Sequence, residues 1–299
     1  IWKSFIEGYR QYLLLECAVS SHTIAGYLSD LRKVEEYDSL SGKNLGPLKF
    51  ELDDIRDFLK YINDLGLSAR SQARLISAVN GFYKFLLLEN VTMVNPAEYI
   101  DLPRIGRKLP VVLSYEEIEL LIHTIDLTKP EGTRNKAIIE TLYSCGLRVS
   151  ELVNLKLSNL FFDEDFIRVT GKGNKERLVP IGPEAIKYIT IYLDEIRRHQ
   201  KVGKESGDIV FLNRRGNQLT RVMIFTIVRN IAEKTGIKKV ISPHTFRHSF
   251  ATHMVEGGAD LRVVQDLLGH QSITTTEIYT HLDTDYLRSA INDFHPRYR

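Results

Sequence analysis

Residues Ser242–His253 read SPHTFRHSFATH, a stretch with three histidines and one arginine but no carboxylate. Ser242 is a favourable N-cap residue and Pro243 suits the first position of a helix, so the stretch predicts a helix that starts here. No acidic residue within the stretch balances its positive potential. We therefore expect this helix both to enter the core and to face something negatively charged.

The predicted helix has two faces, because successive residues rotate by about 100° around its axis. One face gathers Phe246, Phe250, His253 and Met254, which we expect in the core, and the other gathers His244, Arg247, His248 and Ala251. His244 and Arg247 would project beside the helix N-terminus, whose free N–H groups and dipole favour an anion. Arginine matches phosphate or carboxylate oxygens, and histidine can donate or transfer a proton. The motif alone fits an anion site and a solvated helix start equally well.

A metal site is the chemical alternative for the same face. His244 and His248 have the i, i+4 spacing of zinc ligands on a helix. Arg247 points in the same direction, however, and a fixed cation beside a divalent ion is unfavourable. The glutamate of the HExxH zinc motif is also absent from the stretch. We therefore expect no metal ion at this position.

Length and charge suggest two domains with different partners. The 299 residues suffice for about two domains of roughly 150 residues. The net charge is only +2, but residues 1–100 carry 11 basic and 13 acidic side chains, whereas residues 101–299 carry 29 and 25. Within the second part, Arg214–Arg247 holds eight basic residues and one acidic residue. Such a run indicates a solvated face or a surface for a polyanion.

Cysteine usage and hydropathy indicate a cytoplasmic protein. Cys17 and Cys145 are far apart and form no CxxC pair, so a reducing compartment fits. No apolar run approaches the ~20 residues of a membrane span, and charged residues interrupt the N-terminal segment where a signal peptide would need an apolar core. Ile1 is not a usual first residue, so we expect at least one residue before it.

Apolar spacing predicts four helices in the first hundred residues. The first covers Trp2–Leu15, and the second follows the capping residue Ser20. The third covers Leu52–Leu65 and the fourth Ala69–Glu89. Residues 1–100 are therefore expected to form a helical bundle.

A linker is expected at residues 101–114, where two prolines, one glycine and three basic residues disfavour a helix or strand. Ser114 and Glu117 form a capping box, so a second domain is predicted over residues 115–299. A buried helix is expected at Thr133–Ser144, and another from about Val149.

The segment Phe166–Ile181 alternates in period two on both sides of Gly171–Asn174, which predicts a β-hairpin. From Glu184 to the C-terminus the pattern is helical. The fold class is therefore mainly α, with a small antiparallel sheet in a predominantly α second domain.

Four further candidates are weak when each is taken alone. Arg148 lies between two apolar runs and could simply pair with Glu151. Lys172 lies on a glycine-rich turn, where a lysine is usually solvated. His270 follows a glycine, and Tyr279 is one of 14 tyrosines, most of which are expected to serve packing.

Together, and in this order, these residues resemble the catalytic set of the tyrosine site-specific recombinases of the phage integrase family, specifically the Xer-type chromosome-dimer resolvases. The matching positions are Arg148, Lys172, His244, Arg247, His270 and Tyr279. The resemblance extends through CGLRVSEL, GKGNKERLVPI and LRSAINDFHPR and spans nearly the whole chain. It implies that residues 1–100 form a SAM-like core-binding domain and residues 115–299 the catalytic domain.

The resemblance also implies a mechanism that uses no cofactor and no metal. Tyr279 would attack a DNA phosphodiester and form a 3′-phosphotyrosyl link, and a partner strand's 5′-hydroxyl would reverse the step. Arg148 and Arg247 would clamp the phosphate oxygens, as arginine does better than lysine. His244 would act as base and hydrogen-bond donor, and Lys172 would protonate the leaving oxygen. His270 would bind a phosphate oxygen and help place Tyr279.

Double-stranded DNA is therefore the expected partner, and binding should weaken steeply with salt. The tail Asp285–Arg299 resembles a helix that packs into a neighbouring subunit, which implies a homo- or heterotetramer on DNA. A second Xer recombinase and a septal DNA translocase are possible further partners. A mobile-element integrase or excisionase, a type IB topoisomerase and a catalytically silent DNA-binding protein are the alternatives.

Overall fold

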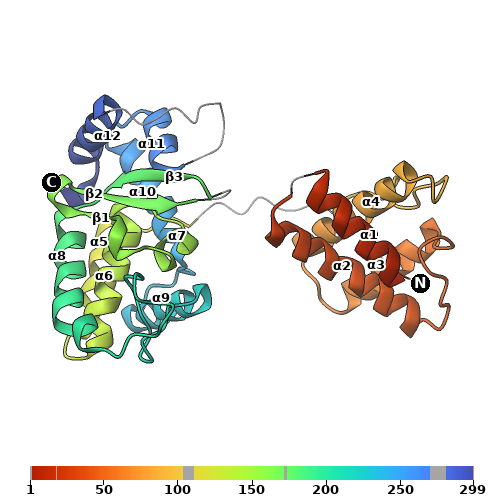
Figure 1. Cartoon of the computed structure of the whole chain (residues 1–299), viewed down its shortest axis with the longest axis horizontal. Coiled ribbons are helices and arrows are strands. Elements are labelled where there is room, and N and C mark those ends of the chain that lie inside the picture. Colours follow the sequence, from red (N-terminus) through yellow and green to blue (C-terminus); the bar gives the residue numbers. More distant parts are fainter. Residues whose placement is uncertain (1, 18, 104–110, 172–173, 270–280, 299) are drawn as a thin grey trace. The chain divides into compact units, whose positions relative to one another are not determined.

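The computed structural model describes residues 2–17, 19–103, 111–171, 174–269 and 281–298 (Figure 1). The chain divides into two compact units, Ile1–Lys108 and Leu109–Arg299. Leu113, near the end of the predicted linker, is fully buried in the core of the second unit, and its N–H donates to Ser249 Oγ over 2.9 Å. Residues 104–110 of the predicted linker lie outside the described residues.

Four helices form the first unit, as the apolar spacing predicts. They are α1 (Trp2–Leu15), α2 (Ser21–Leu40), α3 (Leu52–Asp64) and α4 (Ala69–Leu88). Ser20 and Ser68 cap α2 and α4, because each side chain accepts a hydrogen bond from the backbone N–H three residues later. The apolar faces of all four helices meet in one core.

A buried carboxylate holds this first core together. Trp2 stacks on Phe82, with ring centroids 6.0 Å apart, and its Nε1–H donates to Asp38 Oδ2 over 2.8 Å. The backbone N–H groups of Leu45 and Gly46 donate to the same carboxylate, each over 2.9 Å. Three donors thus satisfy a carboxylate that would be costly to bury unpaired.

The second unit contains a small sheet and most of the remaining helices. Its helices are α5 (Tyr115–His123), α6 (Pro130–Ser144), α7 (Val149–Val153), α8 (Pro183–Ile191), α9 (Arg221–Thr235), α10 (Pro243–Glu256), α11 (Leu261–Leu268) and α12 (His281–Phe294). Shorter helical turns are η1 (Leu157–Asn159), η2 (Phe162–Glu164), η4 (Tyr192–Ile196), η5 (Arg197–His199) and η6 (Pro296–Tyr298). The strands are β1 (Leu160–Phe161), β2 (Phe166–Thr170) and β3 (Glu176–Pro180).

The sheet has the order β1-β2-β3 and is antiparallel throughout, so the predicted hairpin is confirmed. Thr170 pairs with Glu176, which places the glycine-rich turn at the end of this ladder. In Figure 1, α11 and α12 lie on one side of the strands and α6 and α8 on the other. The central helix α6 is buried over almost its whole length and packs against α5, α7, α8 and α10.

The prediction of helix from Glu184 to the C-terminus is wrong over Gln200–Thr220. This segment is a loop, held by backbone hydrogen bonds such as Gly203 N–H to Gly216 O over 2.9 Å. Its glycines, which disfavour helix, outweigh the apolar spacing around them.

The C-terminal tail packs on its own unit. Leu287, Ala290 and Ile291 of α12 are buried in the second core. Beyond them, Arg297 Nε donates to Glu140 Oε2 over 2.9 Å, and the same guanidinium pairs with Glu119. Docking of this tail on a neighbouring subunit stays a prediction.

His295 makes the stability of the second unit depend on pH. Its ring is fully buried against Tyr143, Phe250 and Tyr298, and its Nδ1 accepts the Arg297 backbone N–H over 3.1 Å. Burial, with the nearby charges of His253 and Arg297 after it, lowers the pKa of His295 from 6.5 to about 3.

Below pH 6.5 the unfolded chain therefore binds a proton at His295 that the folded chain does not. This residue's contribution to the free energy of unfolding should fall by about 1.4 kcal/mol for each pH unit between about pH 6 and 4. His295→Asn, whose amide oxygen can replace Nδ1 as acceptor, should lose that slope, and exposed His199→Asn should keep it. Calorimetry suits this test because the single tryptophan, Trp2, reports only on the first unit. Equal slopes in all three proteins would contradict the prediction.

Candidate active site

The N-terminus of α10 has the predicted geometry. Ser242 is its N-cap with an extended backbone, Pro243 occupies the first turn, and Thr245 completes a capping box. Phe246, Phe250, His253 and Met254 are buried, whereas His244 and His248 are exposed. The two-face prediction is thus confirmed for these six residues.

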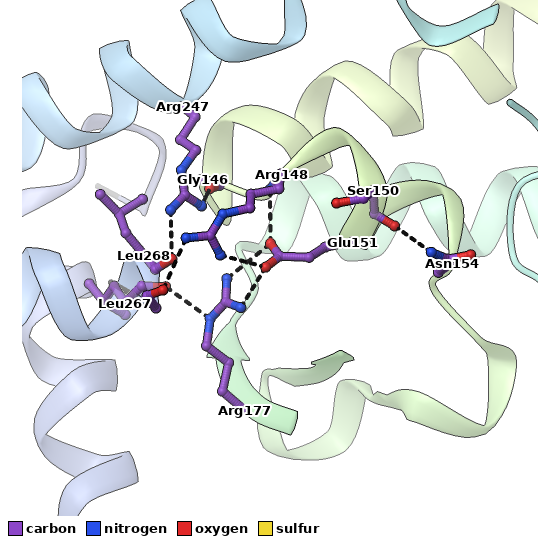
Figure 2. Close-up of polar contacts among 10 residues, drawn as sticks. Gly146, Arg148, Ser150, Glu151, Asn154, Arg177, Arg247, Leu267 and Leu268 are labelled. Carbon is purple, nitrogen blue, oxygen red and sulfur yellow. Dashed lines mark hydrogen bonds and ion pairs between the residues drawn. The ribbon is translucent and has the colours of Figure 1, made fainter. Parts of the chain in front are cut away.

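Arg247 differs from the other residues predicted on the outer face, because it is only 7% exposed. Its Nη1 donates to the carbonyl oxygen of Gly146 over 2.7 Å, and its Nη2 to that of Leu268 over 2.6 Å (Figure 2). These two bonds fix the plane of the guanidinium. Since arginine carries five N–H donors, further donors remain for a ligand.

Arg148 lies at the start of α7 and pairs with Glu151, as the sequence suggests. The Arg148 backbone N–H donates to Glu151 Oε2 over 2.8 Å, and its Nη1 donates to Oε1 over 2.9 Å. Its Nη2 donates to the Gly269 carbonyl oxygen over 3.0 Å. The side chain is 31% exposed, so the guanidinium is held from one side and reaches solvent from the other.

Arg177, on β3, belongs to the same cluster, although the sequence analysis did not single it out. Its Nη1 and Nη2 donate to the two carboxylate oxygens of Glu151 over 2.7 and 3.0 Å, and its Nε donates to Leu267 O over 3.4 Å. A signal was available, because Arg177 has the same parity along the strand as buried Val179. A charged residue at an inward position of a strand requires a buried partner.

The three arginines converge on the C-terminal end of α11 (Figure 2). Arg177, Arg247 and Arg148 donate to three successive carbonyl oxygens, those of Leu267, Leu268 and Gly269 respectively. The last carbonyls of a helix have no partner within the helix and carry the negative end of its dipole. This end therefore stabilises cations that a single carboxylate, Glu151, balances only in part.

Charge and burial set the protonation of the cluster. Burial alone would raise the pKa of Glu151, but its bonds to Arg177 and Arg148 outweigh burial and lower that pKa, so it stays ionised. Burial, then the charge of Arg148, lowers the pKa of Arg247 to about 10, which leaves it a cation at neutral pH. Three cations and one carboxylate leave this cluster with a net charge of +2.

Desolvation by the neighbouring protein atoms, followed by the charges of His248, Arg247 and Arg148, lowers the pKa of His244 even though its side chain reaches solvent. At neutral pH His244 therefore carries a lone pair that can accept a proton. A neutral histidine beside fixed cations is suited to take a proton from a nucleophile while the cations bind an anion.

The structure brings together Arg148, Arg247 and the start of the helix that carries His244. Lys172, His270 and Tyr279 lie outside the described residues. Their described neighbours Gly171 and Gly269 both lie against the arginine cluster. Among the side chains that the structure describes, no three His, Cys, Asp or Glu residues come together as metal ligands would.

Comparison with known proteins assigns the chain. Residues 112–285 match the model of the phage integrase family, and residues 6–90 match that of the phage integrase N-terminal SAM-like domain. The tyrosine recombinase XerD of Chlorobaculum tepidum is 47% identical over 299 residues, covering 99% of this chain and 97% of its own length. That of Staphylococcus aureus is 40% identical over 296 residues, covering 99% of both chains.

A solved structure agrees with these relatives. The XerH site-specific recombinase, bound to a palindromic difH substrate in a post-cleavage complex, is 26% identical with a TM-score of 0.68. The match covers 90% of this chain and 79% of that one.

The chain therefore belongs to the phage integrase family, with the N-terminal helical and C-terminal catalytic parts that define it. Within the family it is an Xer-type tyrosine recombinase, an enzyme that exchanges DNA strands in site-specific recombination. Among the described helices, none combines the length and hydrophobicity that crossing a membrane requires.

Proposed function

We propose that this enzyme cleaves and rejoins DNA at a dif-like site through Tyr279, and thereby resolves chromosome dimers before cell division. The observation that carries the chemistry is the arginine cluster at the end of α11, immediately before His270. Phosphoryl transfer requires little of a protein except positioning and neutralisation of the phosphoryl oxygens. Two fixed guanidinium groups with a net positive surrounding supply both.

The proposed step forms one bond and breaks another. Tyr279 Oη attacks phosphorus and loses its proton to His244, while the bond from phosphorus to the 5′-oxygen breaks. Lys172 protonates that oxygen, which leaves a 3′-phosphotyrosyl link and a free 5′-hydroxyl. Arg148 and Arg247 hold the two non-bridging oxygens, and His270 supports one of them. The proposed step requires no nucleotide cofactor and no metal ion, since the 3′-phosphotyrosyl bond conserves the energy of the phosphodiester for religation.

The relatives support the choice of a dif-like target. Both curated relatives are Xer recombinases, and the solved XerH complex contains a difH substrate. We assign residues 1–100 as the core-binding domain, 101–114 as the linker and 115–299 as the catalytic domain. Four subunits would assemble on two DNA sites through their C-terminal helices. A second Xer recombinase and a septal DNA translocase fit the same scheme.

The polarity of the covalent link tests this proposal. A duplex nicked just 3′ of the scissile phosphate loses a short 5′-hydroxyl fragment on cleavage, which traps the adduct. We expect an adduct only with the strand labelled at its 5′ end, and recombination of a plasmid that carries two dif-like sites. If the enzyme forms an adduct without sequence preference and mainly relaxes the plasmid, it is a topoisomerase. If it binds DNA but forms no adduct, it is a catalytically silent DNA-binding protein. If it exchanges strands efficiently only at the ends of a mobile element, it is an integrase.

A further inference from the structure

The guanidinium of Arg177, on β3, bonds to two other segments of the proposed site, α7 and the end of α11. It pairs with both oxygens of Glu151, the carboxylate that also holds Arg148. Its Nε donates to Leu267 O near the end of α11. The side chain is only 8% exposed, so this arrangement is enclosed by protein.

Two glycines adjoining proposed catalytic residues lie directly on this guanidinium. A Cβ atom at Gly269, the residue before His270, would lie 3.1 Å from Nε, Cζ and Nη1 of Arg177. Gly269 also has a φ of +64°, which side-chain-bearing residues rarely adopt. A Cβ at Gly171, the residue before Lys172, would lie 3.6 Å from Arg177 Nη1. A side chain at either glycine would therefore meet Arg177, so its guanidinium lies next to the backbone that leads into both residues.

We propose that Arg177 is a positioning residue for strand cleavage, which sets the turn carrying Lys172 against α7 and the end of α11. The inference rests on the proposed roles of Lys172 and His270. We assign it a supporting role and not that of a phosphate ligand, because three of its five N–H donors bond to Glu151 and Leu267 and its side chain is only 8% exposed. Its main effect on the rate comes from fixing the backbone position from which the acid, Lys172, extends.

Lysine cannot replace arginine in this role. The two parallel bonds to Glu151 and the third bond to Leu267 use both edges of a planar guanidinium, which an ammonium group does not have. Arg177→Lys would keep the charge beside Glu151 and lose the geometry. Misplacement of a catalytic group by about 1 Å can cost about 10²-fold in rate.

The test compares Arg177→Lys with wild type on two nicked DNA substrates, under single-turnover conditions with saturating enzyme. One has the natural 5′-oxygen at the scissile phosphate, and the other has sulfur in its place. A thiolate leaves without help from an acid, since thiols have a pKa of about 8.5. We expect Arg177→Lys to lose about 10²-fold on the oxygen substrate and at most about tenfold on the sulfur substrate. DNA affinity should stay close to that of wild type, and the melting temperature should fall only moderately and stay well above the assay temperature, because a few buried acceptors lose a donor.

Arg197→Lys is the matched control. Arg197 also donates to backbone carbonyls, those of Ile209 and Gly207 over 3.0 and 2.8 Å, and its hydrogen bonds to described residues do not involve the site. It should cleave both substrates as wild type does.

Three results would overturn the role of Arg177 while leaving the proposed function intact. They are cleavage of the oxygen substrate within threefold of wild type, an equal loss on both substrates, and a loss that parallels weaker DNA binding or unfolding at the assay temperature. Wild-type enzyme that forms no adduct on either substrate would instead overturn the proposed function, and this inference with it.

Discussion

Tyr279→Phe should bind its DNA site with wild-type affinity and form no covalent complex on a nicked substrate. The substitution removes one oxygen atom, the proposed nucleophile, and leaves a ring of the same shape. A tyrosine of pKa about 10 is only about 0.1% phenolate at pH 7, so wild-type attack already depends on the cationic site to remove or stabilise the proton. Without the oxygen, neither route exists. Loss of the nucleophile of a serine protease costs roughly 10⁶-fold, and a comparable loss is expected here.

Tyr188→Phe provides the matched control, because Tyr188 lies on α8 of the same unit, where its ring packs against Lys136 and not against the arginine cluster. It should form adduct at the wild-type rate. The measurement is the fraction of labelled strand that co-migrates with protein after denaturation, alongside a binding curve for each variant. Adduct that persists in Tyr279→Phe would assign the nucleophile to another residue.

The fold could be predicted wherever its determinants are local in sequence. Apolar spacing and caps place α1 to α4, the N-terminus of α10 and the hairpin, because each depends on residues within a few positions of one another. The loop Gln200–Thr220 could not be predicted in this way, because its determinants are not local in sequence. Its apolar residues mimic helical spacing, but its fold depends on backbone pairing between residues more than ten apart, such as Gly203 and Gly216.

The sequence predicts which residue types form the site, but it does not predict the buried contacts that hold those residues in place. The sequence indicates that Arg148 and Arg247 belong together, and that Glu151 is a partner of Arg148. It does not indicate that Arg247 is buried on Leu268 and Gly146, or that Arg177 shares Glu151. These contacts join residues 21 to 101 positions apart, and only the packing of α7, α10, α11 and β3 brings them together.

This difference changes what the HxxR motif means physically. With no carboxylate in Ser242–His253, the sequence suggests a cation whose counter-charge is supplied only when DNA binds. In the structure the end of α11 and Glu151 hold Arg148 and Arg247 in place, so these two side chains are already positioned before a phosphate binds. A positive cluster that is already held in place favours catalysis more than one that DNA must assemble.

Arg247→Ala should therefore reduce the rate of strand cleavage by roughly 10³- to 10⁵-fold, the range for an arginine that stabilises a phosphoryl transition state. The substitution removes a cation and also leaves the carbonyls of Gly146 and Leu268 without these donors, which should cost about 1–3 kcal/mol in stability. Arg134→Ala controls for the second effect. Arg134 is similarly buried and donates to Leu212 O over 2.9 Å, and its other hydrogen bonds to described residues go to Asn135. It should lose stability and keep its cleavage rate.

A substrate with an uncharged scissile phosphate separates the two effects of Arg247→Ala, which are the loss of charge neutralisation at the phosphate and the disruption of the surrounding backbone contacts. Replacing one non-bridging oxygen of the scissile phosphate with a methyl group removes the charge that Arg247 is proposed to neutralise. The difference in single-turnover rate between wild type and Arg247→Ala should then shrink by at least about tenfold, because the variant no longer lacks a partner for that charge. An undiminished difference on the methylated substrate would mean that Arg247 acts only by holding Gly146 and Leu268. In that case the proposed clamp would reduce to Arg148, whose guanidinium is the more exposed of the two.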